Sequence, residues 1–311
     1  MTTTEPMAAA ADDDFPFDDS WFEYKGNRKA PEGHEYRLRD EAGTYIANRK
    51  LITAVNTALL VEKPLLVTGE SGSGKTMLAW SVASELGLLP VLEFHTRSDH
   101  RARDLLFIVD NMRRFYDAQA GHKVAEEFSD RYISWQPLGV AITSEKRHVV
   151  LIDEIDKAPR DFPNDLLDEI DAMKFTVPEL KKVFASEVRP IVIITSNNER
   201  QLPDPFLRRC VFHRIEPPST KVLGLILKER YGAELPEVLM TAAVAQYERL
   251  REDELRLEKK PATGELIVWV RTLIQARVDP ERLGKSKLAK LPFLETMIKN
   301  ASDQKRLEKA G

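Results

Sequence analysis

Short apolar runs alternate with segments of helical periodicity up to about residue 216. The apolar runs are typical of buried strands, and they span residues 64–68, 91–94, 148–153 and 189–195. The segments in which apolar residues recur at helical spacing span 45–61, 77–86, 104–119 and 162–173. Because strands and helices alternate, we expect an α/β fold with a parallel sheet covered by helices on both faces.

The pattern changes after residue 216. Pro217-Pro218-Ser219-Thr220 interrupts it, and apolar residues then recur at helical spacing over 222–231, 235–255, 264–277 and 291–300. We therefore predict an α/β domain over 21–216 and a small all-helical domain over 217–311. Residues 1–20 carry several Asp and Glu residues without any Lys or Arg, and they are predicted to form a disordered acidic tail.

Composition narrows the class of protein. The chain has 311 residues, of which 42% are hydrophobic and 31% charged, and its net charge is -4. These values suit a globular protein and give no overall attraction to nucleic acid or membrane, although they leave room for a local basic patch. Cys210 is the one cysteine, so no intrachain disulfide can form. We see no signal peptide and no apolar run that spans a membrane, and we expect a cytoplasmic location.

The most specific motif follows the first predicted strand. Residues 69–76 fit the pattern G-x-x-x-x-G-K-[ST] of phosphate-binding loops. The motif consists of Gly69, Glu70, Ser71, Gly72, Ser73, Gly74, Lys75 and Thr76. Glycines let the backbone approach a triphosphate closely, and the next helix points its positive N-terminal end at the phosphates. We expect Lys75 to reach the β- and γ-phosphates and the Thr76 hydroxyl to bind Mg²⁺.

Two further strand ends carry polar groups that suit a nucleotide site. The apolar run 149–152 ends in Asp153 and Glu154. Asp153 is expected to hold Mg²⁺, and Glu154 to orient and activate the attacking water. The next strand ends at Asn197 and Asn198, whose amides could reach the γ-phosphate or the water. Asn197 is the first choice and Asn198 the second, because the end of that strand is not fixed by the sequence.

Adjacent arginines, Arg208 and Arg209, follow shortly before Cys210. Such residues are usually solvated or paired with acids. In this context one of them could instead project into the nucleotide site of a neighbouring subunit and neutralise charge that develops on the γ-phosphate.

Taken in order, the phosphate loop, the acidic pair, the polar strand end and Arg-Arg-Cys resemble the core of an AAA+ ATPase with its helical lid. Within that superfamily the chain is most similar to MoxR-like ATPases, in stretches 64–70, 151–158, 166–170, 195–200 and 202–204. The resemblance covers roughly residues 45 to 300. It implies a P-loop nucleotide-binding core with a parallel sheet between helices, followed by a small all-α lid.

The resemblance also implies roles. Lys75, Thr76 and Asp153 become ligands of ATP and Mg²⁺, and Glu154 belongs to the acidic pair. Asn197 resembles the first sensor, and Arg209 resembles a finger that acts on the neighbouring subunit, with Arg208 as the alternate. The family's ring assembly, usually a homo-hexamer, follows from the resemblance alone.

The chain departs from the family in its lid and leaves one insert unexplained. The family carries a second sensor arginine near residues 261–264, and none stands there in this sequence. Arg271 lies two turns further on and could substitute, although a surface or packing role is favoured. Residues 175–188 lie where the family has an inserted hairpin, but they give no substrate clue.

The expected activity is Mg²⁺-dependent ATP hydrolysis that drives remodelling or chaperone-like action on a protein partner. Family members often work with a companion that carries a von Willebrand-type domain. One alternative is a nucleic-acid-directed motor subunit of a restriction or defence complex, which the acidic charge disfavours. Another is a slow nucleotide-gated assembly switch, which the intact acidic pair disfavours. The phosphate motif does not distinguish ATP from GTP.

Two histidines complete the inventory of candidate groups. His95 and His100 are five residues apart, which is a poor metal-ligand spacing, and no cysteine accompanies them in the sequence. We therefore expect both to be ordinary polar histidines.

Overall fold

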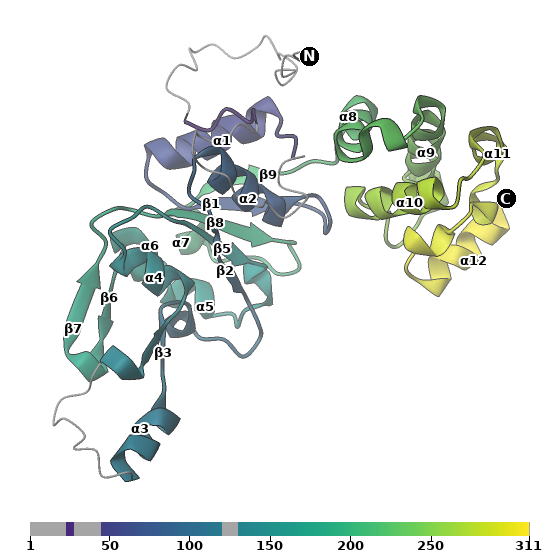
Figure 1. The fold of residues 1–311 in the computed structure, drawn as a ribbon. Helices are drawn as coiled ribbons and strands as arrows, with labels where there is room; N and C mark the ends of the chain where they lie inside the picture. Colours follow the sequence, from purple (N-terminus) through teal and green to yellow (C-terminus); the bar gives the residue numbers. More distant parts are fainter. Residues whose placement is uncertain (1–22, 28–44, 120–129, 311) are drawn as a thin grey trace. The chain divides into compact units, whose positions relative to one another are not determined.

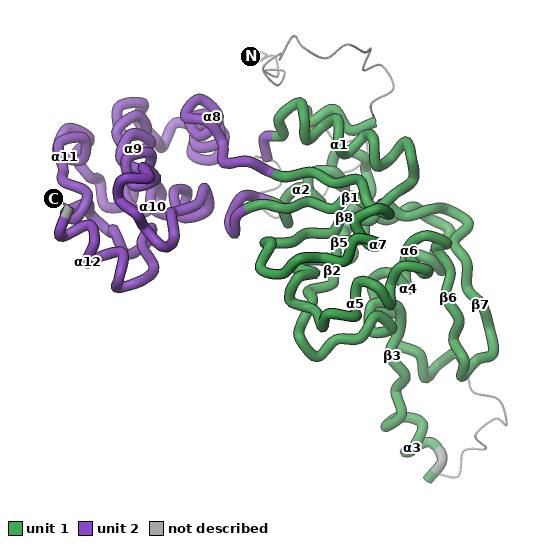
Figure 2. Tube along the Cα trace, turned by 180° about the vertical axis from the view of Figure 1, so that it is seen from behind, with its two compact units in different colours: residues 1–43, 47–69, 75–214 green, residues 44–46, 70–74, 215–311 purple. Residues whose placement is uncertain are grey.

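The structure, a computed structural model, describes residues 23–27, 45–119 and 130–310. The predicted acidic tail at 1–20 lies outside these residues. The chain divides into two compact units (Figure 2). Of the described residues, the first unit contains 23–27, 47–69, 75–119 and 130–214, and the second contains 45–46, 70–74 and 215–310.

The first unit is built on a parallel five-stranded sheet (Figure 1). Its strand order is β2-β5-β8-β1-β9. The strands are β1 (Leu65–Thr68), β2 (Leu92–His95), β5 (Val149–Asp153), β8 (Ile191–Ser196) and β9 (Val211–Arg214). Every residue of β1, β5 and β8 is buried, as expected for strands that are covered on both faces. The predicted α/β fold with a parallel sheet is therefore confirmed.

Helices flank this sheet. They are α1 (Arg49–Leu60), α2 (Lys75–Glu85), α4 (Pro137–Thr143), α5 (Phe162–Asp165), α6 (Leu167–Ala172) and α7 (Asp204–Leu207). The core between sheet and helices is apolar and includes Leu66, Leu138, Ile152 and Phe206. Because all strands are parallel, their carboxyl ends share one edge, where β1 runs toward the phosphate loop and β5 and β8 lie side by side.

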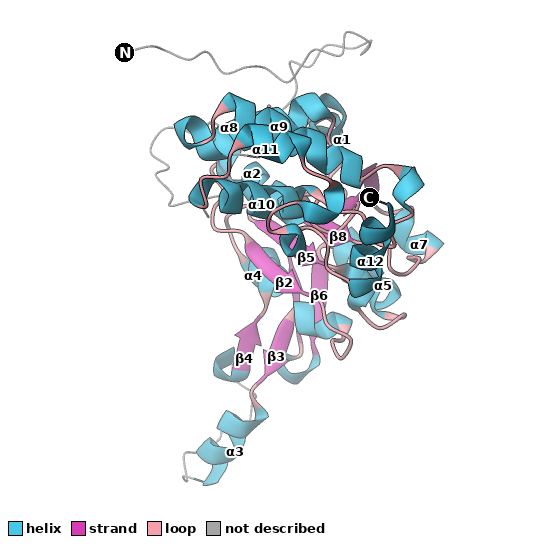
Figure 3. Cartoon of the chain, turned by 90° about the vertical axis from the view of Figure 1, so that its right-hand side faces the viewer, coloured by secondary structure: helices cyan, strands magenta, loops and turns pink. Residues whose placement is uncertain are grey.

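Two antiparallel ribbons extend the first unit. β3 (Phe107–Val109) pairs with β4 (Ile133–Trp135), and α3 (Asn111–Gln119) projects beyond them (Figure 3). The helix expected over 104–119 is therefore wrong in its first half, because β3 finds a partner strand far along the chain. β6 (Lys174–Val177) pairs with β7 (Lys182–Ala185), which confirms a hairpin at 175–188.

The second unit is helical among its described residues. It contains α8 (Thr220–Tyr231), α9 (Glu237–Leu250), α10 (Thr263–Gln275), α11 (Pro280–Lys285) and α12 (Ala301–Ala310), with short 3-10 turns between them. The unit has its own apolar core, in which Trp269 is fully buried.

The helix expected over 291–300 is wrong. Pro292 interrupts the segment, Phe293 adopts a left-handed φ of 56°, and only a 3-10 turn forms there. The helix begins after Asn300, because the Asn300 Oδ1 atom accepts the N–H of Asp303 at 2.7 Å in the manner of an N-cap.

Candidate nucleotide site

The phosphate loop leaves the end of β1 and leads into α2. Gly72 and Gly74 adopt left-handed φ angles of 78° and 89°, which other residues rarely adopt. A Cβ atom on Gly74 would lie only 3.0 Å from Cε2 of Tyr45. Lys75 opens α2 with its side chain buried, and its Nζ donates to the Gly69 carbonyl at 3.0 Å. The conformation of the loop thus explains two of its glycines.

Within the second unit, Arg251 contacts Glu70 of the phosphate loop. The Arg251 guanidinium donates to both carboxylate oxygens of Glu70, at 3.2 and 3.3 Å. The N–H of Gly264, at the start of α10, donates to the Gly72 carbonyl at 3.2 Å. Arg251 was not singled out by the sequence, whereas Arg271 is an exposed residue of α10. The arginine that meets the loop is therefore Arg251.

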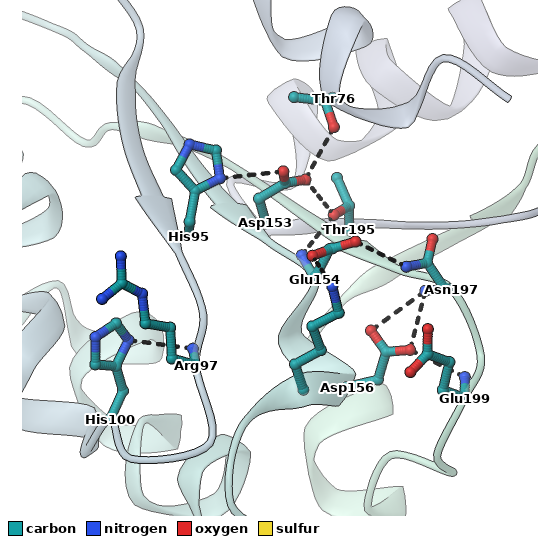
Figure 4. A network of polar contacts seen from close by, with 11 residues as sticks. Thr76, His95, Arg97, His100, Asp153, Glu154, Asp156, Thr195, Asn197 and Glu199 are labelled. Carbon is teal, nitrogen blue, oxygen red and sulfur yellow. Dashed lines mark hydrogen bonds and ion pairs between the residues drawn. The ribbon is translucent and has the colours of Figure 1, made fainter. Parts of the chain in front are cut away.

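Asp153 ends β5 and gathers three side chains around its carboxylate (Figure 4). Its Oδ1 atom accepts hydrogen bonds from the hydroxyls of Thr76, at 3.0 Å, and Thr195, at 2.7 Å. Its Oδ2 atom lies 3.3 Å from Nδ1 of His95. The structure thus brings together Thr76 and Asp153, the two residues expected to hold Mg²⁺.

Glu154 follows in an unusual backbone conformation. Its φ and ψ of 56° and 52° are left-handed, which costs energy for a residue with a side chain. The conformation is fixed because the Glu154 N–H donates to Thr195 Oγ1 at 2.8 Å and the Glu154 carbonyl accepts from the Lys157 N–H at 2.9 Å. This turn directs the Glu154 side chain toward the end of β8.

The Glu154 carboxylate has two polar partners. Its Oε2 atom pairs with Lys157 Nζ at 2.5 Å, and its Oε1 atom accepts from Asn197 Nδ2 at 3.0 Å. The Lys157 contact lowers the pKa of Glu154 and outweighs its partial burial, and Asn197 lowers it further. Glu154 is therefore a charged acceptor at neutral pH. Between the two candidate amides, the structure places Asn197 at Glu154, whereas Asn198 is exposed.

A buried aspartate holds the loop that carries Asn197. Asp156 is 3% exposed, and its carboxylate accepts the backbone N–H groups of Asn197, at 3.1 and 3.2 Å, and Glu199, at 2.9 Å. The sequence reasoning missed this residue. The acid two positions after Asp153-Glu154 was a signal, but its partners lie on another strand end.

The paired arginines lie apart from these carboxylates. Arg209 Nε donates to Asp171 Oδ2 at 2.6 Å, and its Nη1 donates to the Pro205 carbonyl at 3.2 Å. Arg208 is exposed. Across the described residues, neither guanidinium contacts Asp153 or Glu154. Within the described part of the chain, neither Arg208 nor Arg209 reaches the acidic pair of its own subunit.

The groups present fit a nucleotide with a divalent cation. Mg²⁺ prefers oxygen ligands and is usually held by one or two protein groups together with substrate phosphates. Thr76 Oγ1 and Asp153 supply such oxygens. In the described part of the chain, the buried hydroxyls of Thr68, at the end of β1, and of Ser73, in the phosphate loop, lack a hydrogen-bond partner. Buried hydroxyls are usually satisfied, so these two suit a polar ligand.

One protein family matches the region of the chain that holds these groups. Residues 65–218 match the model of the family described as ATPase family associated with various cellular activities (AAA). No curated protein matches the chain. Among solved structures, the chain is similar to a mutant of RuvB from Thermotoga maritima, with 15% identity and a TM-score of 0.44; the match covers 84% of this chain and 77% of that chain.

The matched region includes β1, the phosphate loop, Asp153, Glu154 and Asn197. The chain therefore carries an AAA domain and is an ATPase. No helix among the described residues is long and apolar enough to cross a membrane.

Proposed function

We propose that this ATPase is a MoxR-like machine that assembles with itself, requires Mg²⁺ and uses ATP hydrolysis to remodel a protein partner. The observation that carries the catalytic part is the contact chain Thr76–Asp153–Thr195–Glu154–Asn197 beside Lys75. These five polar residues come from the start of α2, the end of β5 and the end of β8 or the residues directly after these strands, and they meet at one edge of the sheet, where ligands bind in open α/β folds.

In this proposal residues 69–76 bind the triphosphate, and Thr76 and Asp153 hold Mg²⁺, which neutralises phosphate charge. The oxygen of a water bonds to the γ-phosphorus while the bond from that phosphorus to the bridging oxygen breaks, which gives ADP and inorganic phosphate. Glu154 orients this water and takes its proton, which later passes to solvent. Asn197 positions Glu154 and the water. Positioning and charge neutralisation supply most of the rate.

Glu154 must change partners in this cycle. Its carboxylate is paired with Lys157, and a carboxylate held in an ion pair is a poorer acceptor for a water proton. When a water takes its place between Glu154 and the γ-phosphate, the Lys157 contact lengthens or breaks. Lys157→Ala is therefore expected to leave nucleotide affinity unchanged and to alter basal turnover, by about threefold given that the pair is partly exposed.

The finger arginine comes from the neighbouring subunit in this proposal. Arg209 is the first choice and Arg208 the alternate. The absence of either guanidinium from its own site in the described residues supports a role in the next subunit. Arg209 is held by Asp171, which orients it, whereas Arg208 is exposed.

A subunit-mixing experiment tests the shared site. Arg209→Ala is expected to bind nucleotide normally and to lose about 1,000-fold in turnover, because a finger arginine stabilises charge in the transition state. Adding Lys75→Ala protein, which keeps Arg209 but cannot use its own site, is expected to restore part of the activity. Arg208→Ala is the matched control and is expected to retain turnover within about threefold. Normal turnover in Arg209→Ala, with loss in Arg208→Ala, would reassign the finger to Arg208; normal turnover in both would contradict a shared site.

The proposed partner is a protein. Its support is the resemblance to MoxR-like ATPases, which often act with a companion that carries a von Willebrand-type domain. Glu154→Gln protein, held with ATP, is expected to retain such a companion, whereas Lys75→Ala protein is not. Stimulation of hydrolysis by DNA, with a steep dependence on salt, would instead favour a nucleic-acid-directed motor.

A further inference from the structure

His95 lies opposite Asp153 at the edge of the sheet. β2 pairs with β5 in parallel, and the register places His95 beside Asp153. The His95 Nδ1 atom is 3.3 Å from Asp153 Oδ2. A carboxylate has no donor of its own, so in this contact Asp153 is the acceptor group and faces a ring nitrogen of His95. His95 therefore engages the carboxylate oxygen that Thr76 and Thr195 leave open (Figure 4).

The histidine ring is held from its other side as well. Its Nε2 atom lies 3.5 Å from Glu93 Oε2. Glu93 and His95 are two residues apart on β2, so their side chains share one face of the sheet. Trp80 of α2 donates its indole N–H to Glu93 Oε1. Glu93 thus connects the histidine to the helix that begins with Lys75.

These contacts connect α2 to Asp153 by two routes. Thr76 and Trp80 are four residues apart on α2 and therefore lie on the same side of that helix. Thr76 reaches Asp153 directly, and Trp80 reaches it through Glu93 and His95. We infer that Glu93 and His95 are positioning residues that orient the Asp153 carboxylate toward its divalent cation.

The inference rests on the proposed binding of Mg²⁺ and ATP. Groups that hydrogen-bond to a metal ligand fix its orientation, and their loss typically lowers metal affinity by about 10- to 100-fold. The effect here belongs at the lower end, about tenfold, because the His95 side chain is 60% exposed. It acts on the cation and not on the nucleotide itself, since neither residue lies in the phosphate loop.

The test compares nucleotide affinity with and without Mg²⁺. A fluorescent ADP or ATP analogue is titrated against the full chain in Mg²⁺ and in EDTA, and the ratio of the two affinities is the readout. For His95→Ala we expect the EDTA affinity of the wild type and a ratio lowered about tenfold. Glu93→Gln is expected to lower the ratio less, because it leaves the Asp153 contact in place.

Two further variants test whether the effect comes from the contact between His95 and Asp153. His95→Asn should recover part of the ratio, because its amide N–H occupies the position of the ring Nδ1. His100→Ala is the matched control. His100 lies in the same segment, but its ring packs at a tilt against Phe94, with 4.8 Å between ring centroids, and its Nδ1 accepts from the Arg97 N–H. It should keep the wild-type ratio.

The outcomes separate this inference from the function on which it rests. A wild type that binds nucleotide equally well in Mg²⁺ and EDTA would contradict the proposed Mg²⁺ site. A wild type with a clear Mg²⁺ effect that His95→Ala retains in full would overturn the inference alone. Equal loss of affinity in Mg²⁺ and EDTA for His95→Ala would also overturn it, since that result indicates a damaged loop.

Discussion

Each of the two compact units buries an aspartate that accepts backbone N–H groups. One aspartate fixes a loop beside the candidate site, and the other fixes a loop within the helical unit. In the first unit, Asp156 binds the N–H groups of Asn197 and Glu199. In the second unit, Asp303 is fully buried and binds the N–H groups of Glu258 and Lys259, at 2.8 and 3.0 Å. The two sets of hydrogen bonds are alike. Of the two aspartates, it is Asp156 that holds the loop whose Asn197 side chain contacts Glu154.

The comparison separates two uses of one interaction. A buried carboxylate that accepts several backbone N–H groups fixes a loop that has no regular hydrogen bonds of its own. Where the loop carries Asn197, the result is a positioned side chain. Where the loop joins parts of a helical core, the result is stability. We therefore expect mutations at the two aspartates to separate turnover from folding.

The largest effect is expected from Asp156→Ala. The Asn197 loop would lose its anchor, and a displacement of about 1 Å near reacting groups can lower a rate by about 100-fold. We expect kcat to fall by that amount while nucleotide affinity changes by less than about threefold. Asp156→Asn, which keeps an acceptor oxygen, should fall between this variant and the wild type. Steady-state kinetics with a separate binding titration measure both quantities. An unchanged kcat in Asp156→Ala would contradict a role for Asp156 in positioning Asn197.

Asp303→Ala should show the opposite behaviour. It leaves the donors of Glu258 and Lys259 without a buried acceptor, and each such loss costs about 1–3 kcal/mol. We expect the Tm of the second unit to fall by about 10 °C and its amide hydrogens to exchange faster. At low temperature, turnover should stay within about threefold of the wild type. A 100-fold loss of kcat with an unchanged Tm would mean that Asp303 also serves the site.

The stability that Asp303 contributes is expected to depend on pH below about pH 5. Burial opposes the charged form of Asp303, but the N–H groups of Glu258 and Lys259 and the amide of Asn300 together lower its pKa. A carboxyl whose folded pKa lies below its unfolded value of about 3.9 adds stability above that value and loses it as pH falls through the folded pKa. The gap in Tm between wild type and Asp303→Asn should therefore be constant above about pH 5 and shrink below pH 4. A gap that widens in acid would contradict this assignment.

The smallest functional effect is expected at Cys210. Burial, with a further contribution from Asp171, raises the pKa of this thiol to about 12. A thiol that stays protonated reacts slowly with iodoacetamide. We expect native protein to be labelled far more slowly at pH 8 than unfolded protein, and Cys210→Ala to keep turnover within about twofold. Equal labelling rates in the native and unfolded states would show that the thiol is not held in this environment.

The sequence predicts the parts of the site that follow one another along the chain. Lys75 and Thr76 stand in a contiguous motif, and Asp153 and Glu154 end an apolar run, so local patterns were sufficient. The α/β fold followed from the alternation of strands and helices. The positions of Arg208 and Arg209 in an assembly stay a prediction.

The parts that the sequence did not predict depend on pairing between distant segments. The spacing of His95 from His100 is poor for a metal site, and the partner of His95 is Asp153 on the neighbouring strand. Asp156 and Arg251 were missed for the same reason, because their partners lie on another strand end and in the phosphate loop. Residues 107–109 lie in a segment whose periodicity predicts a helix, but they form a strand because they pair with β4, which lies beyond residue 130.

We propose that Glu154 activates the water for ATP hydrolysis at a site completed by self-assembly. ATP hydrolysis per subunit, measured against protein concentration for wild type and Glu154→Gln, tests it most directly. We predict a wild-type rate that rises cooperatively with concentration and a mutant rate lower by at least about 100-fold, with nucleotide binding retained. A specific rate that is independent of concentration and equally high in Glu154→Gln would contradict the account.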